Sequence, residues 1–290
     1  MPVSGLLRCV GRLPVRSNDS PTAIMLHHLH EPNATYPPSS GSLGPRQFTE
    51  LLEAYPDHTL VFDDGLKCQL DIAVPILEAL GRKAIFCVTT GHFEGRAATI
   101  EPHRDFRERV GLANFYARFA NITRGVQVPE GSPDDFPDFY SAADIKFQRT
   151  RDAMPPAAYD SIMEGMGLDV QKEAERLYLS QGDLLELTRR GFYVGLHSHT
   201  HPLKLSEMTA YEQRDEWQSN KDWVESSAQQ VVAHASYPSD QYSALSEQIL
   251  TTLGVFAAYR AGEDVRYTDT PMEITRIDHH QACIDAGIKL

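Results

Sequence analysis

The stretch HTLVFDDG, residues 58–65, shows the pattern that decides the fold. A short apolar run is followed directly by two adjacent carboxylates, Asp63 and Asp64, and then by Gly65. A strand that is apolar throughout, rather than on alternate positions, is typical of a parallel strand that helices cover. Parallel α/β proteins gather their functional groups at the carboxyl ends of such strands. The stretch therefore predicts a buried strand that delivers two carboxylates to a site.

Similar apolar runs alternate with helical patterns on both sides of this stretch. The predicted strands lie at residues 22–26, 58–62, 83–88, 192–196, 231–235 and 255–259. The predicted helices lie at residues 46–55, 68–80, 181–190, 209–230 and 244–253. The order of strands and helices predicts an α/β fold in which parallel strands form a barrel-like sheet.

Residues 93–178 interrupt this alternation. They carry aromatic and helical patterns and a loop-like stretch, PEGSPDDFPDFY, but no strand system of their own. Predicted barrel strands lie on both sides of them, so an excursion from one barrel loop is the simplest explanation. We expect residues 1–290 to form a single domain with a helical insertion at about 93–178.

Composition limits the classes of partner. The formal net charge of −13 argues against nucleic acid, because phosphate binding relies on clustered Lys and Arg. Four cysteines stand far apart without a CxxC pair, which favours free thiols in a reducing compartment. Arg8 and Arg12 interrupt the apolar N-terminal residues, and no later run has the length of a membrane span. We therefore expect a soluble, cytoplasmic protein without a membrane span.

A second polar cluster, HSHTHP at residues 197–202, also follows an apolar strand. Asp-Asp-Gly alone is ordinary turn chemistry, but three imidazoles at a second strand end favour a metal that prefers nitrogen and oxygen ligands. Two His and one carboxylate that leave a position for water form the arrangement of a catalytic zinc site. The remaining carboxylate can then accept a proton from the attacking water.

The motifs VFDDG and HSHTHP resemble the first and second motifs of the polysaccharide deacetylase family, which is carbohydrate esterase family 4 and NodB-like. The resemblance implies a distorted (β/α) barrel and one divalent metal, zinc before cobalt, nickel or manganese. It assigns Asp63 as the catalytic base. It assigns the metal ligands to Asp64, His197 and His201. His199 then has either no direct role or a supporting contact with the ligands.

Further segments extend the resemblance. HASYPSDQY is similar to the family's third segment, which implies that Tyr237 and Pro238 bind substrate. The family's Arg in that segment, which orients the catalytic Asp, has no clear counterpart here. The segment EITRIDHHQ offers His279 and His280 as candidates for the general acid, with a polar surface pair as the alternative. His27 resembles a His in the family's early strand-end element and is expected to line the site.

The combination of MLHHLH, FDDGLKCQ and the insertion is similar to family members associated with bacterial capsule and lipopolysaccharide O-antigen synthesis. It implies N-deacetylation of an acetamido sugar or sugar conjugate. An O-deacetylase, a sugar uronamide deamidase and a non-catalytic glycan-binding relative remain alternatives. A non-haem iron oxygenase also uses two His and one carboxylate, but it would leave Asp63 without a task.

The insertion carries a cluster of basic residues in an otherwise acidic chain. Arg104, Arg107 and Arg109 lie in one stretch, and Arg149 and Arg151 lie in another. A charge run of this kind is usually a solvated helix face with ordinary ion pairs. The alternative hypothesis is that Arg104 and Arg107 grip the diphosphate of a sugar carrier, because a planar guanidinium suits that group.

Overall fold

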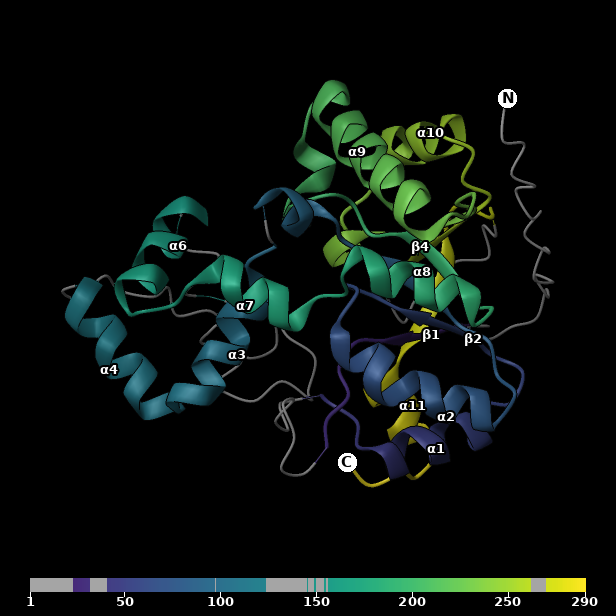
Figure 1. Ribbon diagram of the computed structural model, residues 1–290, viewed down its shortest axis with the longest axis horizontal. Coiled ribbons are helices and arrows are strands. Elements are labelled where there is room, and N and C mark those ends of the chain that lie inside the picture. The colour runs from purple at the N-terminus through teal and green to yellow at the C-terminus, as the bar shows by residue number, and fades with distance from the viewer. Residues whose placement is uncertain are drawn as a thin grey trace.

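The computed structural model describes residues 23–31, 41–96, 98–123, 145, 149, 154, 156–261 and 270–290. Seven strands of this part of the chain form a closed barrel in chain order (Figure 1). Every neighbouring pair is parallel, including β1 with β7. The strands are β1 Ala23–Leu26, β2 Thr59–Phe62, β3 Ile85–Val88, β4 Tyr193–Leu196, β5 His234–Ser236, β6 Ala257–Arg260 and β7 Ile274–Asp278. The predicted α/β barrel is confirmed.

Strand β7 is the strand that the sequence patterns do not predict. Its sequence, ITRID, contains no apolar run, and Arg276 stands in its middle. Arg276 is nevertheless 1% exposed, because its guanidinium pairs with Asp63. Strand β5 also differs from the prediction, since it occupies His234–Ser236 instead of residues 231–235.

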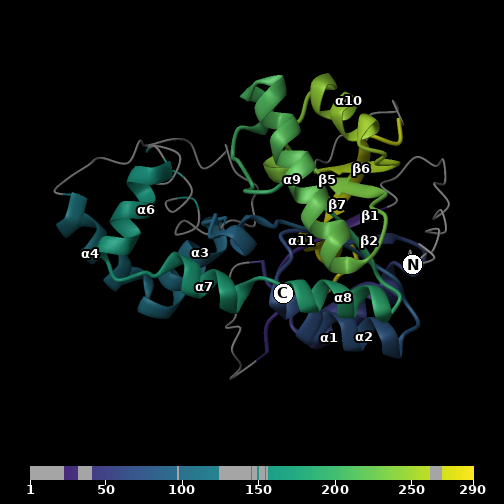
Figure 2. The same ribbon diagram turned by 45° about the horizontal axis from the view of Figure 1, so that its top comes forward.

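Helices surround the barrel and bury their apolar faces against it (Figures 1 and 2). They are α1 Pro45–Ala54, α2 Val74–Ala79, α8 Gln181–Arg189, α9 Ala210–Ala228, α10 Ala244–Thr252 and α11 His279–Asp285. The main core between helices and strands includes Phe48, Phe62, Phe86 and Trp217. A π-helical turn, η1 Gln69–Ala73, precedes α2 where one continuous helix was expected. Short 3-10 turns occupy η4 Leu205–Glu207 and η5 Pro238–Asp240.

The predicted insertion region lies between β3 and β4. It contains η2 Gly91–Glu94, α3 Ile100–Val110, α4 Leu112–Thr123, α6 Pro156–Gly165 and α7 Val170–Leu177. Helices α3, α4, α6 and α7 form a lobe beside the barrel, on the left in Figure 1. They pack around their own apolar cluster, which includes Phe106, Phe115, Tyr159 and Met163. The loop-like stretch at 129–140 lies outside the described residues.

Three cysteines can be placed in this structure. Cys68, Cys87 and Cys283 are buried free thiols. Cys9, together with Arg8 and Arg12, lies outside the described part. Within that part, no helix combines the length and the apolar character needed to cross a membrane.

Candidate active site

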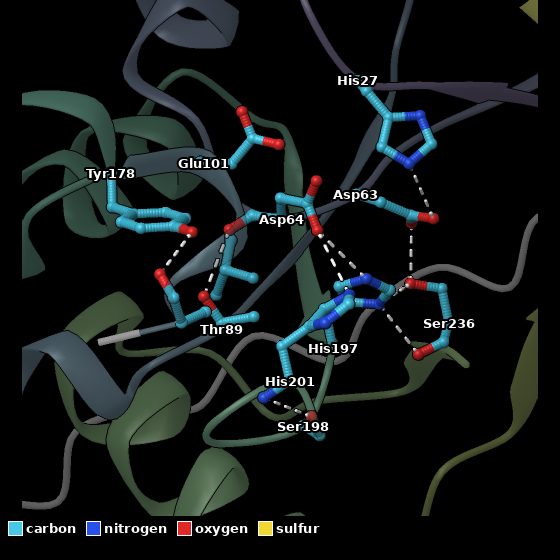
Figure 3. A network of polar contacts seen from close by, with 12 residues as sticks. His27, Asp63, Asp64, Thr89, Glu101, Tyr178, His197, Ser198, His201 and Ser236 are labelled. Atoms are coloured by element: carbon cyan, nitrogen blue, oxygen red, sulfur yellow. Dashed lines mark hydrogen bonds and ion pairs between the residues drawn. The ribbon is translucent and has the colours of Figure 1, made fainter. Parts of the chain in front are cut away.

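The predicted metal ligands meet at the carboxyl end of the barrel. Asp64 follows β2, whereas His197 follows β4 and His201 lies in the loop after it. The Oδ1 atom of Asp64 lies 3.3 Å from Nε2 of His197 and 3.6 Å from Nε2 of His201 (Figure 3). The three residues offer ligand atoms within 4.8 Å of one another. This set of two imidazoles and one carboxylate fits a divalent cation such as zinc.

The loops that carry these ligands contain unusual backbone conformations. Asp64, Ser198 and His201 have φ values of 70°, 58° and 55°, in the left-handed region that side chains disfavour. Such conformations cluster at functional sites and persist only where surrounding contacts hold them. The His201 backbone N–H donates to Oγ of Ser198, and that of His197 donates to Oδ1 of Asn220. These contacts hold the ligand loop in place.

A contact of the ring nitrogen Nδ1 orients the imidazole of His197. Its Nδ1 lies 3.0 Å from the backbone oxygen of Ser236, so Nε2 points toward Asp64. Such a bond on the second ring nitrogen is how proteins fix the tautomer of a metal-binding His. Burial lowers the pKa of His197, but the nearby carboxylates of Asp63 and Asp64 outweigh burial and raise it. Burial raises the pKa of Asp64, and the neighbouring imidazoles reverse that shift, so the carboxyl group is ionised.

Two other groups of His and carboxylate residues in the described part of the chain fit a metal less well. In His27, Asp278 and His279, both ring nitrogens of His279 face backbone carbonyls, Met25 O at 3.2 Å and Gly41 O at 2.5 Å. No nitrogen of His279 is therefore left for a cation.

The other group joins His28, Asp64 and Glu101. There the guanidinium of Arg104 lies 3.4 Å from Oε2 of Glu101. Arg104 already supplies the positive charge that an ion would bring. The site after β2 and β4 therefore fits a metal best.

Asp63 lies beside the ligands but has different partners. Its Oδ1 accepts hydrogen bonds from Oγ of Ser236 and from Nη1 of Arg276, both at 2.7 Å. Its Oδ2 faces Nε2 of His27 at 3.9 Å. Burial raises the pKa of Asp63, which is 2% exposed, but Arg276 first and then His197 and His27 bring it below its ordinary value. Asp63 is thus an ionised carboxylate with Oδ1 fixed and Oδ2 toward His27.

Arg276 is a candidate functional residue that the sequence motifs did not reveal. The sequence offers no Arg before Pro238, and Ser236 occupies that strand end instead. The structure provides the guanidinium from β7, where it reaches Asp63 inside the barrel. The available signal was the arginine itself, which stands in the segment EITRIDHHQ beside the candidate general acids.

Gln69 is a second residue that the sequence did not reveal. It is fully buried in the π-helical turn after the Asp-Asp-Gly motif. Its Nε2 donates to the backbone oxygens of His27, at 3.0 Å, and of Asp63, at 2.7 Å. Gln69 therefore joins the carboxyl ends of β1 and β2. π-Bulges of this kind are frequent at functional sites.

The structure places the other predicted site residues in different surroundings. His27 lies at the site (Figure 3), whereas His280 is the second residue of α11 and is half-buried. Tyr237 is buried, stacks on Tyr242 and donates its hydroxyl to Met272 O, and Pro238 is buried beside it. His199 is buried with Nδ1 2.9 Å from Oγ1 of Thr90.

Residues 167–258 match the sequence model of the polysaccharide deacetylase family. This region includes the HSHTHP motif, strands β4 and β5 and the beginning of β6. This part of the chain is similar to that family. The Asp-Asp-Gly motif lies outside the matched region but meets its two His residues in the barrel. A comparison with curated protein sequences finds no match.

Solved structures show a similar fold over most of this chain. A Streptococcus pyogenes deacetylase, PplD, in complex with acetate gives a TM-score of 0.54 at 16% identity, covering 90% of this chain and 93% of its own. IcaB from Ammonifex degensii gives 0.54 at 14% identity, covering 93% and 97%. A polysaccharide deacetylase from Bacillus cereus gives 0.51 at 12% identity, covering 92% and 69%.

Proposed function

We propose that the protein is a metal-dependent hydrolase that removes the N-acetyl group from an amino sugar. The observation that carries the proposal is the pairing of two differently held carboxylates. Asp64 faces two imidazoles in an arrangement that fits a cation, and Asp63 is fixed beside it by Arg276 and Ser236. Amide hydrolysis by an attacking water uses this division between a cation ligand and a base.

Each residue then has a task in hydrolysis. Asp64, His197 and His201 would hold the divalent cation, zinc first and cobalt, nickel or manganese as alternatives. Such a cation, when bound, polarises a carbonyl group and makes water more acidic. Asp63 accepts a proton at Oδ2 as the water oxygen attacks the carbonyl carbon, while Arg276 and Ser236 hold Oδ1. The bond between the carbonyl carbon and the nitrogen then breaks, releasing acetate and the amine.

The leaving nitrogen needs a proton, and the geometry favours His27 as its donor. Nε2 of His27 lies 3.9 Å from Oδ2 of Asp63, within the same site. The two residues that the sequence comparison offered, His279 and His280, are less suited. Both nitrogens of His279 face backbone carbonyls. We therefore place the general acid at His27.

The proposed substrate is an acetamido sugar, free or conjugated, in the synthesis of a bacterial surface glycan. The motifs shared with capsule and O-antigen family members support this setting, as does a proposed cytoplasmic location. An O-acetyl ester or a sugar uronamide would be attacked by the same groups. They differ in the leaving group, an alcohol or ammonia in place of a sugar amine.

The test loads the protein with zinc, cobalt or nickel and measures acetate released from N-acetylated and O-acetylated sugars, with ammonia measured from a uronamide. We expect acetate from an N-acetyl sugar and much less from the Asp63→Asn protein under the same metal loading. Release of ammonia alone would instead identify a deamidase. No product from any substrate would support a non-catalytic relative.

A further inference from the structure

The insertion reaches the proposed metal centre through helix α3. Glu101, in the first turn of α3, is buried, and its Oε2 lies 2.6 Å from Nε2 of His28. Glu101, His28 and Asp64 offer polar atoms within 4.8 Å of one another. Figure 3 shows Glu101 near Asp64, away from the side where His27 lies. Part of the wall of the active site therefore comes from the insertion.

Arg104 adds a positive charge to this wall. Its Nε lies 3.4 Å from Oε2 of Glu101, and its side chain is 19% exposed. Burial and the charge of Arg104 together lower the pKa of His28 to about 4, so His28 is uncharged at neutral pH. Among the described residues, no hydrogen-bond partner is present for the two terminal nitrogens of Arg104. The guanidinium thus keeps two donors for a ligand.

The neighbouring arginines of α3 are occupied. Arg107 is 1% exposed and donates hydrogen bonds to Glu108 through Nε and Nη2. It therefore cannot bind a diphosphate, although its charge suggested that role. Arg109 binds Asp105 and Glu173, each at 2.7 Å. Of the three arginines in this stretch, Arg104 is therefore the one placed to meet a substrate.

We propose that Arg104 determines specificity by binding an oxyanion, a phosphate or a carboxylate, that the sugar carries. This inference rests on the proposed function. Glu101 holds the guanidinium by Nε, which leaves the two terminal nitrogens to form the paired donors that suit such oxyanions. The surrounding carboxylates of Asp64 and Glu101 would repel an anion elsewhere on this wall. Arg104 therefore gives an acidic chain a specific place for an anionic substrate.

The test compares three probes: N-acetylglucosamine, N-acetylglucosamine 1-phosphate and the carboxylate N-acetylglucosaminuronic acid. Their binding to metal-loaded protein is measured by calorimetry, and KM and kcat are measured by acetate release. Arg104→Gln should weaken binding of at least one anionic probe and raise its KM about ten- to a hundredfold, the value of a charge-assisted hydrogen bond. Binding of the neutral sugar and kcat should stay unchanged, and Arg104→Lys should lose less. The affected probe, phosphate or uronate, identifies the anion.

Arg109→Gln is the matched control, because Arg109 lies on the same helix but is paired. It should leave all three probes unaffected. Equal effects of Arg104→Gln on neutral and anionic probes, or no effect on either, would overturn the proposal. Calorimetry tests the role of Arg104 even if the protein releases no acetate. The absence of acetate from every substrate would count against the proposed function. A selective loss of anion binding in Arg104→Gln would still support the role of Arg104.

Discussion

At the scale of single residues, two adjacent carboxylates acquire different chemistry from their surroundings. Asp64 turns toward two imidazoles with its backbone in the left-handed region, while Asp63 faces Arg276 and Ser236. The order of two identical residue types cannot reveal this division. The resemblance to the deacetylases predicts a base and a metal ligand, and the two carboxylates have different contacts.

The division predicts opposite phenotypes for the two carboxylates. Asp64→Ala should abolish stoichiometric zinc binding, because it removes one of three ligands. Asp63→Asn should retain zinc but lower kcat about a hundred- to ten-thousandfold, the usual loss on removing a positioned base. Metal analysis and acetate release measure both properties. Full zinc content in Asp64→Ala would refute the ligand assignment, as near-normal turnover in Asp63→Asn would refute the base.

Arg276 should set the pH at which Asp63 becomes active. Asp63 has a pKa below its ordinary value, so the wild-type base is lost only as pH falls through that lowered pKa. Arg276→Met removes the main cause of the shift, which raises the pKa of Asp63. The acid limb of the kcat/KM profile should therefore move to higher pH, and activity should recover as pH rises.

The same change also removes one partner of a buried pair, which costs about 3–5 kcal/mol of stability. The pH profile is therefore recorded below the unfolding temperature, and Arg276→Lys should restore part of both properties. Arg190→Met, which changes a surface arginine paired with Glu78 and Glu186, is the control. An acid limb that does not move in Arg276→Met would exclude the proposed role.

If His27 is the general acid, replacing His27 should slow turnover far more than replacing His280. His27→Asn should lower kcat about a hundred- to ten-thousandfold while leaving zinc bound, because His27 is not one of the three ligands. His280→Asn should leave kcat nearly unchanged. Rates measured at saturating substrate with equal zinc content separate the two residues. The reverse result would return the acid to the C-terminal pair.

At the scale of elements, apolar runs predicted six strands and the helices between them. They could not predict β7, because a strand that faces the barrel interior with a charged residue has no apolar signature. The π-helical turn was also unpredicted, since the residues of η1 have ordinary helical periodicity. Both departures lie at the site: β7 supplies Arg276, and η1 supplies Gln69.

A close approach between loops depends on Gly91, which opens η2. Its N–H donates to the backbone oxygen of His199 at 2.7 Å, next to the ligand loop. A Cβ at this position would lie 2.1 Å from Arg96 O and 2.9 Å from His199 O. Gly91→Ala should therefore lower the free energy of unfolding by about 1–3 kcal/mol, the usual cost of overpacking.

Chemical denaturation monitored by fluorescence measures this effect, with Gly182→Ala as the control. A Cβ at Gly182 would have only the Ser180 hydroxyl nearby, at 3.7 Å, and alanine favours the helix that contains it. Gly182→Ala should be neutral or stabilising. A Gly91→Ala protein as stable as the wild type would show that the loop can shift without cost.

At the scale of the whole molecule, barrel closure assembles the site from distant segments. Asp63, Ser236 and Arg276 are separated by up to 213 positions, yet they form one hydrogen-bonded group. The two sequence motifs could be recognised because each is local. Partners such as Arg276, Gln69 and Glu101 could not be, because their contacts exist only when strand ends and the insertion meet.

The proposed hydrolysis requires one metal ion at one site. The most direct measurement titrates metal-free protein with zinc while acetate release from an N-acetylated amino sugar is recorded. We predict that the rate rises in proportion to added zinc and stops rising at one equivalent per chain, since three ligands converge on one position. Acetate release that is independent of zinc, or zinc binding without any acetate release, would contradict the account.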